Sequence, residues 1–173
     1  VVLEAFRRLR KEHPSSRLVL VPRHPERGEA VCQWARAVGR AELLSANPEN
    51  WTILVVDRVG YLFALYRWAQ GAFVGGSLVP KGGQNLLEPA AWGVPVARGP
   101  HMEDFAEGAG ALERLGATRT VTDAASLAEA WRWALTDEGK AAGHRGRAYV
   151  EGLGGAASAT WHEVAFRLGI RRA

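Results

Sequence analysis

The segment 75–89, GGSLVPKGGQNLLEP, combines glycines, a lysine and polar side chains at a spacing that suits anion binding. Four glycines fall within the nine positions from Gly75 to Gly83, and Lys81 lies among them. Glycines leave backbone N–H groups uncovered, and the helix that we expect to follow adds partial positive charge at its start. We therefore predict an anion-binding loop, with a plain turn of left-handed glycines as the alternative. The residue order matches neither a Walker P-loop nor a Gly-x-Gly-x-x-Gly motif.

Glu88 lies one turn into the expected helix, three residues beyond Asn85. A carboxylate at this place can accept two hydrogen bonds from a ribose diol while the preceding loop holds a phosphate. The alternative is a carboxylate that only stabilises the positive end of the helix. Pro89 restricts the residue before it away from the α-helical region, which favours the ribose interpretation slightly.

A second candidate for anion binding is the turn at Arg23 and His24, which lies between two prolines after a predicted strand. The prolines stiffen the turn, and a guanidinium held in fixed geometry suits a phosphate or a carboxylate. An ordinary solvated loop is the alternative. His101 lies after another predicted strand, but a lone histidine in a loop is more often structural or solvated.

No catalytic or metal-binding constellation follows from the spacing of the other reactive residues. The histidines lack the spacing of a metal motif, and the single cysteine, Cys32, excludes a disulfide framework and a cysteine-based zinc site. Ser77 lacks the context of a nucleophilic serine, so we assign no catalytic residue to this chain. We expect neither a metal ion nor a bound cofactor.

Short apolar runs alternate with amphipathic stretches, which predicts an α/β fold: a Rossmann-like open parallel sheet with helices on both faces. The expected strands cover residues 18–22, 53–57, 72–75, 94–98 and 118–122. The expected helices cover the N-terminal segment, residues 26–39, 60–70, 85–92 and 103–115, a stretch capped by Asp123, and residues 137–150 and 156–168. Ligands of such sheets bind beyond the carboxyl ends of the strands, where the glycine loop and the Arg23 turn both fall.

Helical spacing also predicts which side chains face the core. In the helix over 26–39 the expected buried face consists of Ala30, Val31, Trp34 and Val38. The tryptophans within amphipathic stretches are expected to pack rather than to stack on a ligand; they are Trp34, Trp68, Trp131 and Trp161.

The composition fits one soluble domain over residues 1–173. A chain of 173 residues with 47% hydrophobic residues can bury a core without disulfide or metal staples. No run reaches the roughly 18 apolar residues of a membrane span, and no segment reads as a signal peptide. The 22 Lys and Arg residues, which give a net charge of +4, are spread along the chain. A nucleic-acid-binding protein would concentrate them in a stripe, so we predict no nucleic-acid partner.

Four motifs in one colinear order carry a resemblance to a known family: PRHPE (22–26), VD…G (56–60), FVGGSLVPKGGQNLLEPAAWGVPV (73–96) and GPH (99–101). In these motifs the sequence resembles the 3-deoxy-D-manno-octulosonic acid (Kdo) transferases of lipopolysaccharide assembly. The resemblance implies a GT-B glycosyltransferase with two Rossmann-like domains. This chain would be the C-terminal, donor-binding half.

The resemblance further implies that this half binds CMP-Kdo without a metal ion and that transfer to a lipid A-type acceptor inverts the configuration. It assigns donor binding to Arg23, His24, Ser77, Lys81, Gly82, Gly83, Gln84, Asn85 and Glu88. The general base, the surface for the lipid-linked acceptor and the membrane anchor are expected in an N-terminal domain outside this chain. The full-length protein is expected at the cytoplasmic side of the inner membrane.

Two departures from the family pattern leave the donor open. The usual Gly-Glu-Leu is replaced by Gly60-Tyr61-Leu62, and Gln84 stands where the family has histidine. Glutamine keeps a hydrogen bond but cannot carry a charge. The alternatives are another GT-B transferase or epimerase that uses a UDP-sugar, and a non-catalytic nucleotide-binding module.

Overall fold

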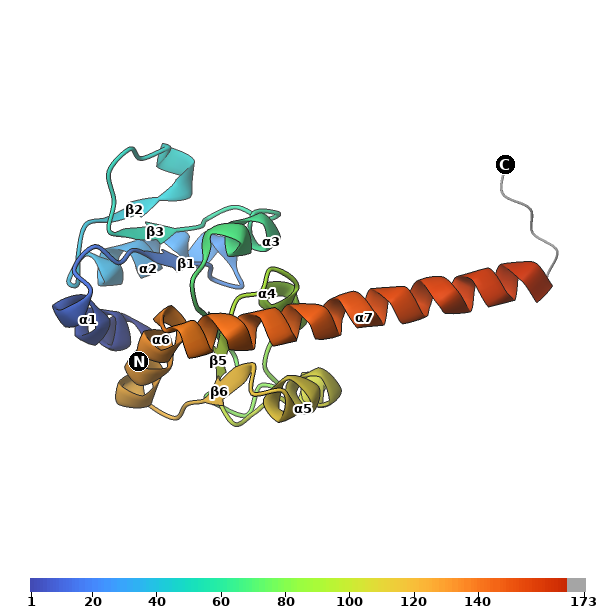
Figure 1. The fold of residues 1–173 in the computed structure, drawn as a ribbon. Coiled ribbons are helices and arrows are strands. Elements are labelled where there is room, and N and C mark those ends of the chain that lie inside the picture. The colour runs from blue at the N-terminus through green and yellow to red at the C-terminus, as the bar shows by residue number, and fades with distance from the viewer. Residues whose placement is uncertain (168–173) are drawn as a thin grey trace.

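The computed structural model describes the backbone of residues 1–167 and the side chains of residues 1–154. Its strands pair in parallel and form two three-stranded sheets, in the orders β1-β3-β2 and β4-β5-β6 (Figure 1). The strands are β1 (Leu18–Leu20), β2 (Ala41–Leu43), β3 (Ile53–Val55), β4 (Ala72–Val74), β5 (Val96–Arg98) and β6 (Thr118–Thr120). Because every pair is parallel, the carboxyl ends of the strands of each sheet share one edge.

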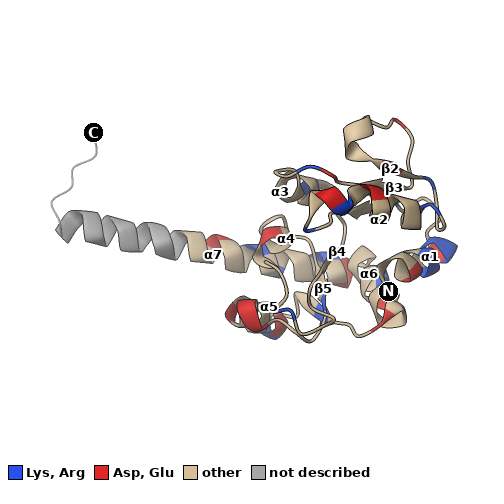
Figure 2. Ribbon diagram, turned by 180° about the vertical axis from the view of Figure 1, so that it is seen from behind, with Lys and Arg blue, Asp and Glu red and all other residues tan. Residues whose placement is uncertain are grey.

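Helices connect the strands and cover the sheets. The α-helices are α1 (Val2–Glu12), α2 (Gly28–Ala35), α3 (Leu62–Leu65), α4 (Leu87–Ala91), α5 (Ala106–Arg114), α6 (Ala124–Leu135) and α7 (Asp137–Arg167). Short 3₁₀ turns lie at η1 (Pro25–Arg27), η2 (Leu44–Ala46), η3 (Tyr66–Trp68) and η4 (Glu103–Phe105). Seen from behind, α2 and α3 lie on the side of the first sheet, and α5 lies with the second (Figure 2).

Two adjacent residues of β5 show that the second sheet is covered on both faces. Ala97 joins a hydrophobic cluster with residues of α1, α2 and α6, and this cluster also contains Ile53 and Val55 of the first sheet. Val96 joins a separate cluster with residues of α4 and α5. Successive side chains of a strand point to opposite faces, so the sheet must lie between the two clusters. The first cluster holds both sheets together because it includes residues from each.

The predicted α/β class with parallel strands and covering helices is confirmed, with two corrections to the strands. The strand β2 was not predicted, because Ala-Glu-Leu is too short and too polar at Glu42 to stand out as an apolar run. The prediction of one open sheet is also corrected. Among the described residues the strands form two separate hydrogen-bonded sheets. The two sheets share a hydrophobic core, but no hydrogen-bonded ladder joins them.

The predicted pair of helices at 137–150 and 156–168 is wrong, because α7 runs without a break from Asp137 to Arg167. The glycines of the segment 151–155 were interpreted as a break. A glycine costs a helix about 1 kcal/mol relative to alanine but keeps its N–H donor, so it does not end a helix as proline does. Residue 168 lies outside the described residues. None of the helices of the described chain is both long and apolar enough to cross a membrane.

The predicted buried face of the helix over 26–39 is confirmed at Val31 and Val38, which are partly buried against the core, and wrong at Ala30 and Trp34, which are exposed. The α-helix is shorter, and its fully buried residues are Gly28, Cys32 and Ala35, whereas Trp34 keeps 60% of its surface exposed. Small side chains face the sheet here because the approach is close: a Cβ on Gly28 would lie 2.7 Å from the Cβ of Asp57.

The expectation that the tryptophans pack is confirmed at one position and wrong at two. Trp131 is buried in α6, whereas Trp34 and Trp68 are exposed, Trp68 to 79% of its surface. Helical spacing predicts a buried face only where a second element covers it. The side chain of Trp161 lies outside the described side chains.

The predicted cap of α6 at Asp123 is confirmed and is reciprocal. Oδ1 of Asp123 accepts a hydrogen bond from the N–H of Ser126 at 2.8 Å, and the Ser126 hydroxyl accepts one from the Asp123 N–H at 3.1 Å. These bonds satisfy N–H groups that the first turn of a helix leaves without a partner. The helix they begin carries Leu127 and Trp131 into the core shared by both sheets.

We expect the contribution of Asp123 to stability to depend on pH. Hydrogen bonds from the backbone N–H and the hydroxyl of Ser126 hold the pKa of Asp123 below its ordinary value of 3.8. The stabilisation is therefore present above the unfolded-state pKa and is lost as pH falls through the lowered, folded-state pKa. Asp123→Asn keeps a capping oxygen that does not titrate. The excess unfolding free energy of the wild type over this variant should shrink between about pH 6 and about pH 3 in chemical denaturation. A difference that is constant with pH would contradict this assignment.

Candidate functional site

The segment that follows β4 is held in a folded loop by left-handed glycines. Gly76, Gly82 and Gly83 have φ angles of 72°, 74° and 80°, which residues with a Cβ rarely adopt. The N–H of Gly83 donates to the carbonyl oxygen of Gly76 at 3.2 Å, which brings the two glycine pairs of the sequence together. The loop is thus a closed structure with a defined backbone path.

Ser77 fastens this loop to the carboxyl ends of two neighbouring strands. Its side chain is fully buried, and its hydroxyl donates to the carbonyl oxygen of Val74 at 2.5 Å. The same hydroxyl accepts from the N–H of Gly99 at 2.8 Å, and the Ser77 carbonyl accepts from the N–H of His101 at 3.0 Å. A Cβ on Gly99 would overlap the Ser77 backbone, so only glycine fits there. Ser77 was predicted as a donor-binding residue, and the structure places its hydroxyl inside the protein, joining β4 to β5.

The turn between β5 and α5 forms a support beneath the second glycine pair. The N–H of Asp104 donates to the carbonyl oxygen of Gly82 at 3.1 Å. A Cβ on Gly82 would overlap the Asp104 carboxylate, and one on Gly83 would lie 2.6 Å from Sδ of Met102. These residues were not predicted as part of the site, since no local pattern links them to a loop about twenty positions earlier.

Fewer backbone donors of the loop are free than the sequence suggested. The N–H groups of Lys81 and Gly83 donate within the loop, at 2.7 Å to Val79 and at 3.2 Å to Gly76. The Lys81 side chain is exposed, and Gln84, three residues later, is partly buried. The α-helix begins at Leu87 rather than at Asn85 and spans only five residues, so its dipole is small.

Asn85 and Glu88 lie together, a contact that was not predicted. Nδ2 of Asn85 donates to Oε1 of Glu88 at 3.3 Å, and Oδ1 of Asn85 accepts from the N–H of Leu87 at 3.0 Å. Burial, and after it the negative charge of Glu88, raises the pKa of Tyr66 to about 12. Glu88 is thus a partly buried, oriented carboxylate at the end of the glycine loop.

Arg23 and His24 occupy the exposed turn between β1 and η1. Nδ1 of His24 lies 3.5 Å from Oε1 of Glu26, in a pair whose side chains are 61% and 73% exposed. Arg23 is exposed as well. The interactions found among the described residues do not join this turn to the glycine loop, and both side chains remain accessible to a ligand.

Two further charged residues at strand ends have structural roles. Asp57, after β3, accepts from the N–H of Ser45 at 3.0 Å and so ties the ends of β3 and β2. Burial alone would raise the pKa of Asp57, but the Ser45 hydrogen bonds lower it below its ordinary value. Arg98, at the end of β5, is 6% exposed; it donates to Gly99 O at 3.1 Å and pairs with Glu113 at 3.0 Å.

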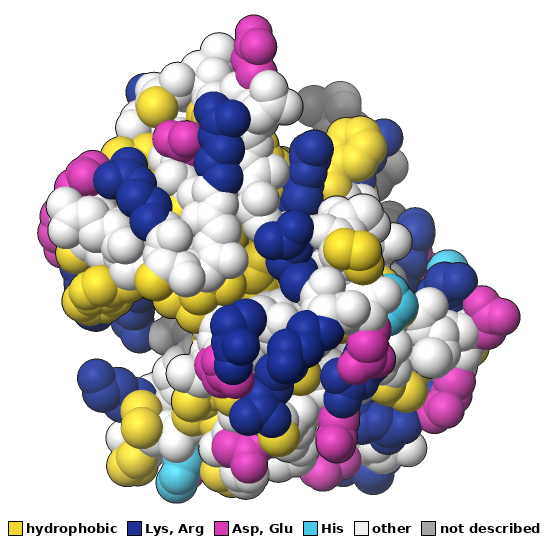
Figure 3. All heavy atoms as spheres, turned by 90° about the vertical axis from the view of Figure 1, so that its left-hand side faces the viewer, with side chains coloured by type: hydrophobic (Ala, Val, Ile, Leu, Met, Phe, Trp, Pro, Cys, Tyr) yellow, Lys and Arg dark blue, Asp and Glu magenta, His cyan; other side chains and the backbone are white. Residues whose placement is uncertain are grey.

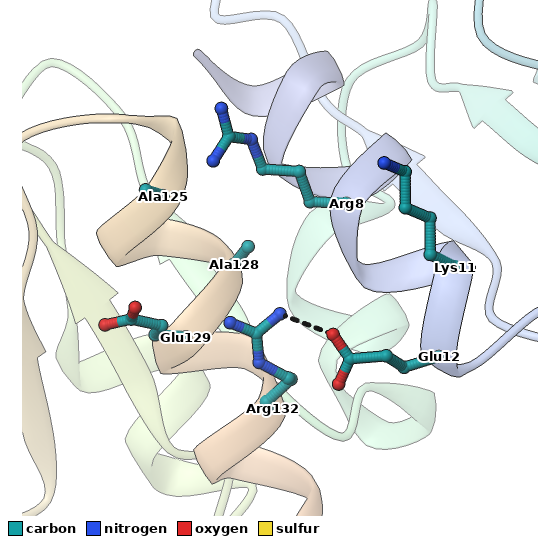
Figure 4. Close-up of a pocket in the computed structure, with 7 residues that line it drawn as sticks. All are labelled: Arg8, Lys11, Glu12, Ala125, Ala128, Glu129 and Arg132. Carbon is teal, nitrogen blue, oxygen red and sulfur yellow. Dashed lines mark hydrogen bonds and ion pairs between the residues drawn. The ribbon is translucent and has the colours of Figure 1, made fainter.

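Two shallow hollows among the described residues lie away from these side chains. One of about 220 Å³ lies between α1 and α6, where Arg132 donates to Glu12 at 3.1 Å (Figure 4). Another of about 290 Å³ is lined by residues of α6 and α7 and of the loops that follow η3 and α4. The glycine loop lines neither of these two hollows. Among the described residues no group of three His, Cys, Asp or Glu side chains is placed to hold a metal ion.

The basic residues on the α1 side of the molecule are interspersed with acidic ones (Figure 3). Glu4 accepts hydrogen bonds from Arg7 at 2.8 Å and from Arg8 at 2.9 Å. These bonds lower the pKa of Glu4 to about 2. Glu4 therefore balances part of the positive charge of α1, whereas Glu12 of the same helix pairs with Arg132 of α6 at 3.1 Å.

Parallel strands, helices on both faces of the second sheet and a glycine loop beyond its carboxyl ends define the class: a Rossmann-like α/β domain. No protein-family model matches the chain. Its fold is similar to that of the C-terminal CMP-Kdo binding domain of WaaA from Acinetobacter baumannii, with a TM-score of 0.73 and 29% identity. This likeness covers 83% of the present chain and 80% of the other.

Relatives of known name agree with the structural likeness. The chain is 39% identical over 117 residues to the 3-deoxy-D-manno-octulosonic acid transferase of Aquifex aeolicus. This match covers 68% of this chain and 33% of the relative. The chain is also 38% identical over 111 residues to the enzyme of the same name from Haemophilus influenzae. This match covers 62% of this chain and 26% of that relative. The chain thus spans about a quarter to a third of these relatives. It belongs to the Kdo transferase family and corresponds to the C-terminal domain, as the motifs predicted.

We expect Ser77→Ala to lower the unfolding free energy by about 1–3 kcal/mol, since it leaves the buried N–H of Gly99 without its acceptor. Chemical denaturation of the two proteins measures the difference. Ser15→Ala is the matched control: Ser15 is exposed and its hydroxyl makes no hydrogen bond among the described residues, so the change should stay within about 0.5 kcal/mol. Equal effects of the two substitutions would show that the Ser77 hydroxyl does not hold the loop.

Proposed function

We propose that this chain is the donor-binding domain of a glycosyltransferase that transfers Kdo from CMP-Kdo. The observation that carries the proposal is the oriented Asn85–Glu88 pair at the end of the glycine loop, joined by a 3.3 Å hydrogen bond. The similarity to a solved CMP-Kdo binding domain supports a CMP-sugar as the ligand.

Different residues of the site bind different parts of the donor. Glu88 accepts hydrogen bonds from the ribose hydroxyls, and Asn85 orients it. Lys81, with the backbone of Gly82 and Gly83 and the side chain of Gln84, faces the phosphate and the sugar. Ser77 contributes indirectly, because its buried hydroxyl fixes the loop to β5.

Arg23 and His24 act from the first sheet on the phosphate or the cytosine. Their exposed turn follows β1, so it lies at the carboxyl edge of its own parallel sheet. Arginine suits this role because its planar guanidinium binds a phosphate through two hydrogen bonds.

In the proposed reaction an acceptor hydroxyl attacks the anomeric carbon of the donor, and the bond from that carbon to the phosphate oxygen breaks. The proton of the hydroxyl passes to a general base, and the electron pair leaves with CMP. Attack opposite the leaving group inverts the anomeric carbon. Lys81 and the loop backbone stabilise the charge that develops on the phosphate, and no metal ion is needed for donor binding.

The general base and the acceptor site are proposed to belong to an N-terminal domain in a GT-B arrangement. The exposure of Arg23, His24 and Lys81 to solvent in this chain supports this. Ligand sites commonly lie between domains, where the second domain excludes water. The acceptor is proposed to be a lipid A-type lipid at the cytoplasmic side of the inner membrane.

Calorimetric titration with CMP, UMP, UDP and phosphate tests the donor class directly. We expect CMP to bind most tightly. A preference for a uridine nucleotide would instead indicate a UDP-sugar enzyme, to which the replacements at Tyr61 and Gln84 would then belong. If none of the four ligands binds the chain, the donor-domain proposal fails for the isolated chain, and so does the alternative of a nucleotide-binding module.

The role of Glu88 is tested by removing either partner of its contact with ribose. We expect Glu88→Ala to weaken CMP binding by about tenfold or more, the value of a hydrogen bond to a charged group. The wild type should bind 2′-deoxy-CMP more weakly than CMP by a similar factor, whereas the variant should bind the two nucleotides equally. Glu107→Ala, an exposed glutamate in the first turn of α5, is the control and should leave CMP affinity unchanged. If the variant still distinguishes the two nucleotides as the wild type does, Glu88 does not bind the ribose.

A further inference from the structure

The helical stretch that follows β3 turns aromatic side chains to the solvent. α3 and η3 run together from Leu62 to Trp68, and none of their residues is fully buried. Tyr61, Phe63 and Trp68 are 43%, 50% and 79% exposed. The exposed positions of this stretch, residues 60–61, 63–64 and 67–68, recur at helical spacing and so share one face. In an ordinary surface helix this outer face is polar.

Phe63 extends this exposed apolar face to the neighbouring helix α4. Its ring centroid lies 5.6 Å from that of Trp92 at the end of α4, and Trp92 is partly exposed as well. The two helices lie next to each other in the fold (Figure 1). Large apolar side chains gathered on one exposed face mark an interaction site, whereas single exposed ones do not. We call this set the α3 surface; it comprises Arg58, Val59, Tyr61, Phe63, Arg67, Trp68 and Trp92.

The charged side chains of the α3 surface are positive. From residue 58 to residue 71 the chain contains Arg58 and Arg67 but neither Asp nor Glu. Both arginines are exposed, and the Arg67 guanidinium lies 5.6 Å from the ring centroid of Trp68. Asp57 before this stretch and Glu88 of α4 are partly buried and accept hydrogen bonds within the protein. The charge of this surface is therefore complementary to an anionic partner.

We propose that the α3 surface docks this domain on an anionic lipid surface. Tryptophan, tyrosine and phenylalanine gather at the boundary between head groups and acyl chains, where their rings meet both water and hydrocarbon. Arginines beside them attract anionic head groups. Lipid fits better than a protein partner, because the hot-spot aromatics of protein interfaces sit in packed pockets. Here Trp68 protrudes, and no aromatic residue of the α3 surface lines either hollow of the described chain.

Docking through the α3 surface places one edge of the first sheet beside the lipid. Val59 and Tyr61 follow the carboxyl end of β3, and the Arg23 turn follows that of β1, its parallel neighbour. The α3 surface and this turn therefore leave the same edge of the sheet. The lipid contact itself does not rest on the proposed function, since the residues of the α3 surface are assigned to no part of the donor. Its benefit does: with a lipid-linked acceptor, docking brings the donor to the surface that holds the acceptor.

Co-sedimentation with lipid vesicles tests the proposal. One set of vesicles contains equal parts of phosphatidylcholine and phosphatidylglycerol, and the other contains phosphatidylcholine alone. We expect the chain to bind the anionic vesicles about tenfold more tightly or better, because each arginine near an anionic surface contributes about fivefold. Arg67→Gln combined with Trp68→Ser should weaken binding to the anionic vesicles by about fiftyfold, the product of that fivefold charge effect and about tenfold for the lost burial of the indole. Added salt should reduce only the charge effect.

A matched double variant on α2 separates this surface from a general effect of charge. Trp34→Ser combined with Arg36→Gln also removes an exposed tryptophan and an exposed arginine, and so changes the net charge equally. It should bind the anionic vesicles nearly as the wild type does. Val59→Ser replaces an apolar side chain that lies outside the helix and is exposed, so it should weaken vesicle binding without disturbing the fold. Circular dichroism of each variant checks the fold.

Two results would overturn the inference. The wild type fails to bind the anionic vesicles, in which case the α3 surface is left to a protein partner, or the two double variants lose affinity equally, in which case the binding is a general charge effect. Titration of the same proteins with CMP reports on the donor site separately. Either result therefore leaves the proposed function standing, and a failure of CMP binding alone leaves the lipid contact standing.

Discussion

The arrangement of the site depends on the hydroxyl of Ser77, a polar group that the fold buries completely. It donates to Val74 at the end of β4 and accepts from Gly99 after β5, at 2.5 and 2.8 Å. A buried hydroxyl must find such partners, and here the partners are the ends of two neighbouring parallel strands. The β4–β5 ladder brings the two strand ends together, and the Ser77 hydroxyl fixes the loop to both of them.

A hydrophobic core that both sheets share holds in place the strands whose ends meet at this junction. Residues of α1, α2 and α6 form one hydrophobic cluster with strands of both sheets, while a second cluster lies between the other face of the second sheet and α4 and α5. The polar groups are thus confined to the strand ends, where the backbone is not covered by helices. Arg23, His24 and Lys81 are exposed on this chain, which agrees with a domain that works against a partner domain.

Local sequence patterns predicted a large part of this structure. The strand runs, the Asp123 cap and the short helix at Pro89 all follow from residues within a few positions of one another. Tertiary packing overrode local patterns elsewhere. Trp34 has the spacing of a core residue yet is 60% exposed, because α2 meets the sheet through Gly28, Cys32 and Ala35. The glycines at 152, 154 and 155 suggested a break that the continuous helix α7 does not contain.

The sequence by itself determined the α/β class, the place of the glycine loop and the family, since periodicity and motif order are properties of the chain read along its length. Only the tertiary structure decided that the Ser77 hydroxyl points inward and that Met102 and Asp104 underlie Gly83 and Gly82. Those contacts join segments about twenty residues apart, and their geometry depends on how β4 and β5 pair and on how the turn before α5 packs. A carboxylate beside an anion loop therefore becomes visible only once the strand ends are placed side by side.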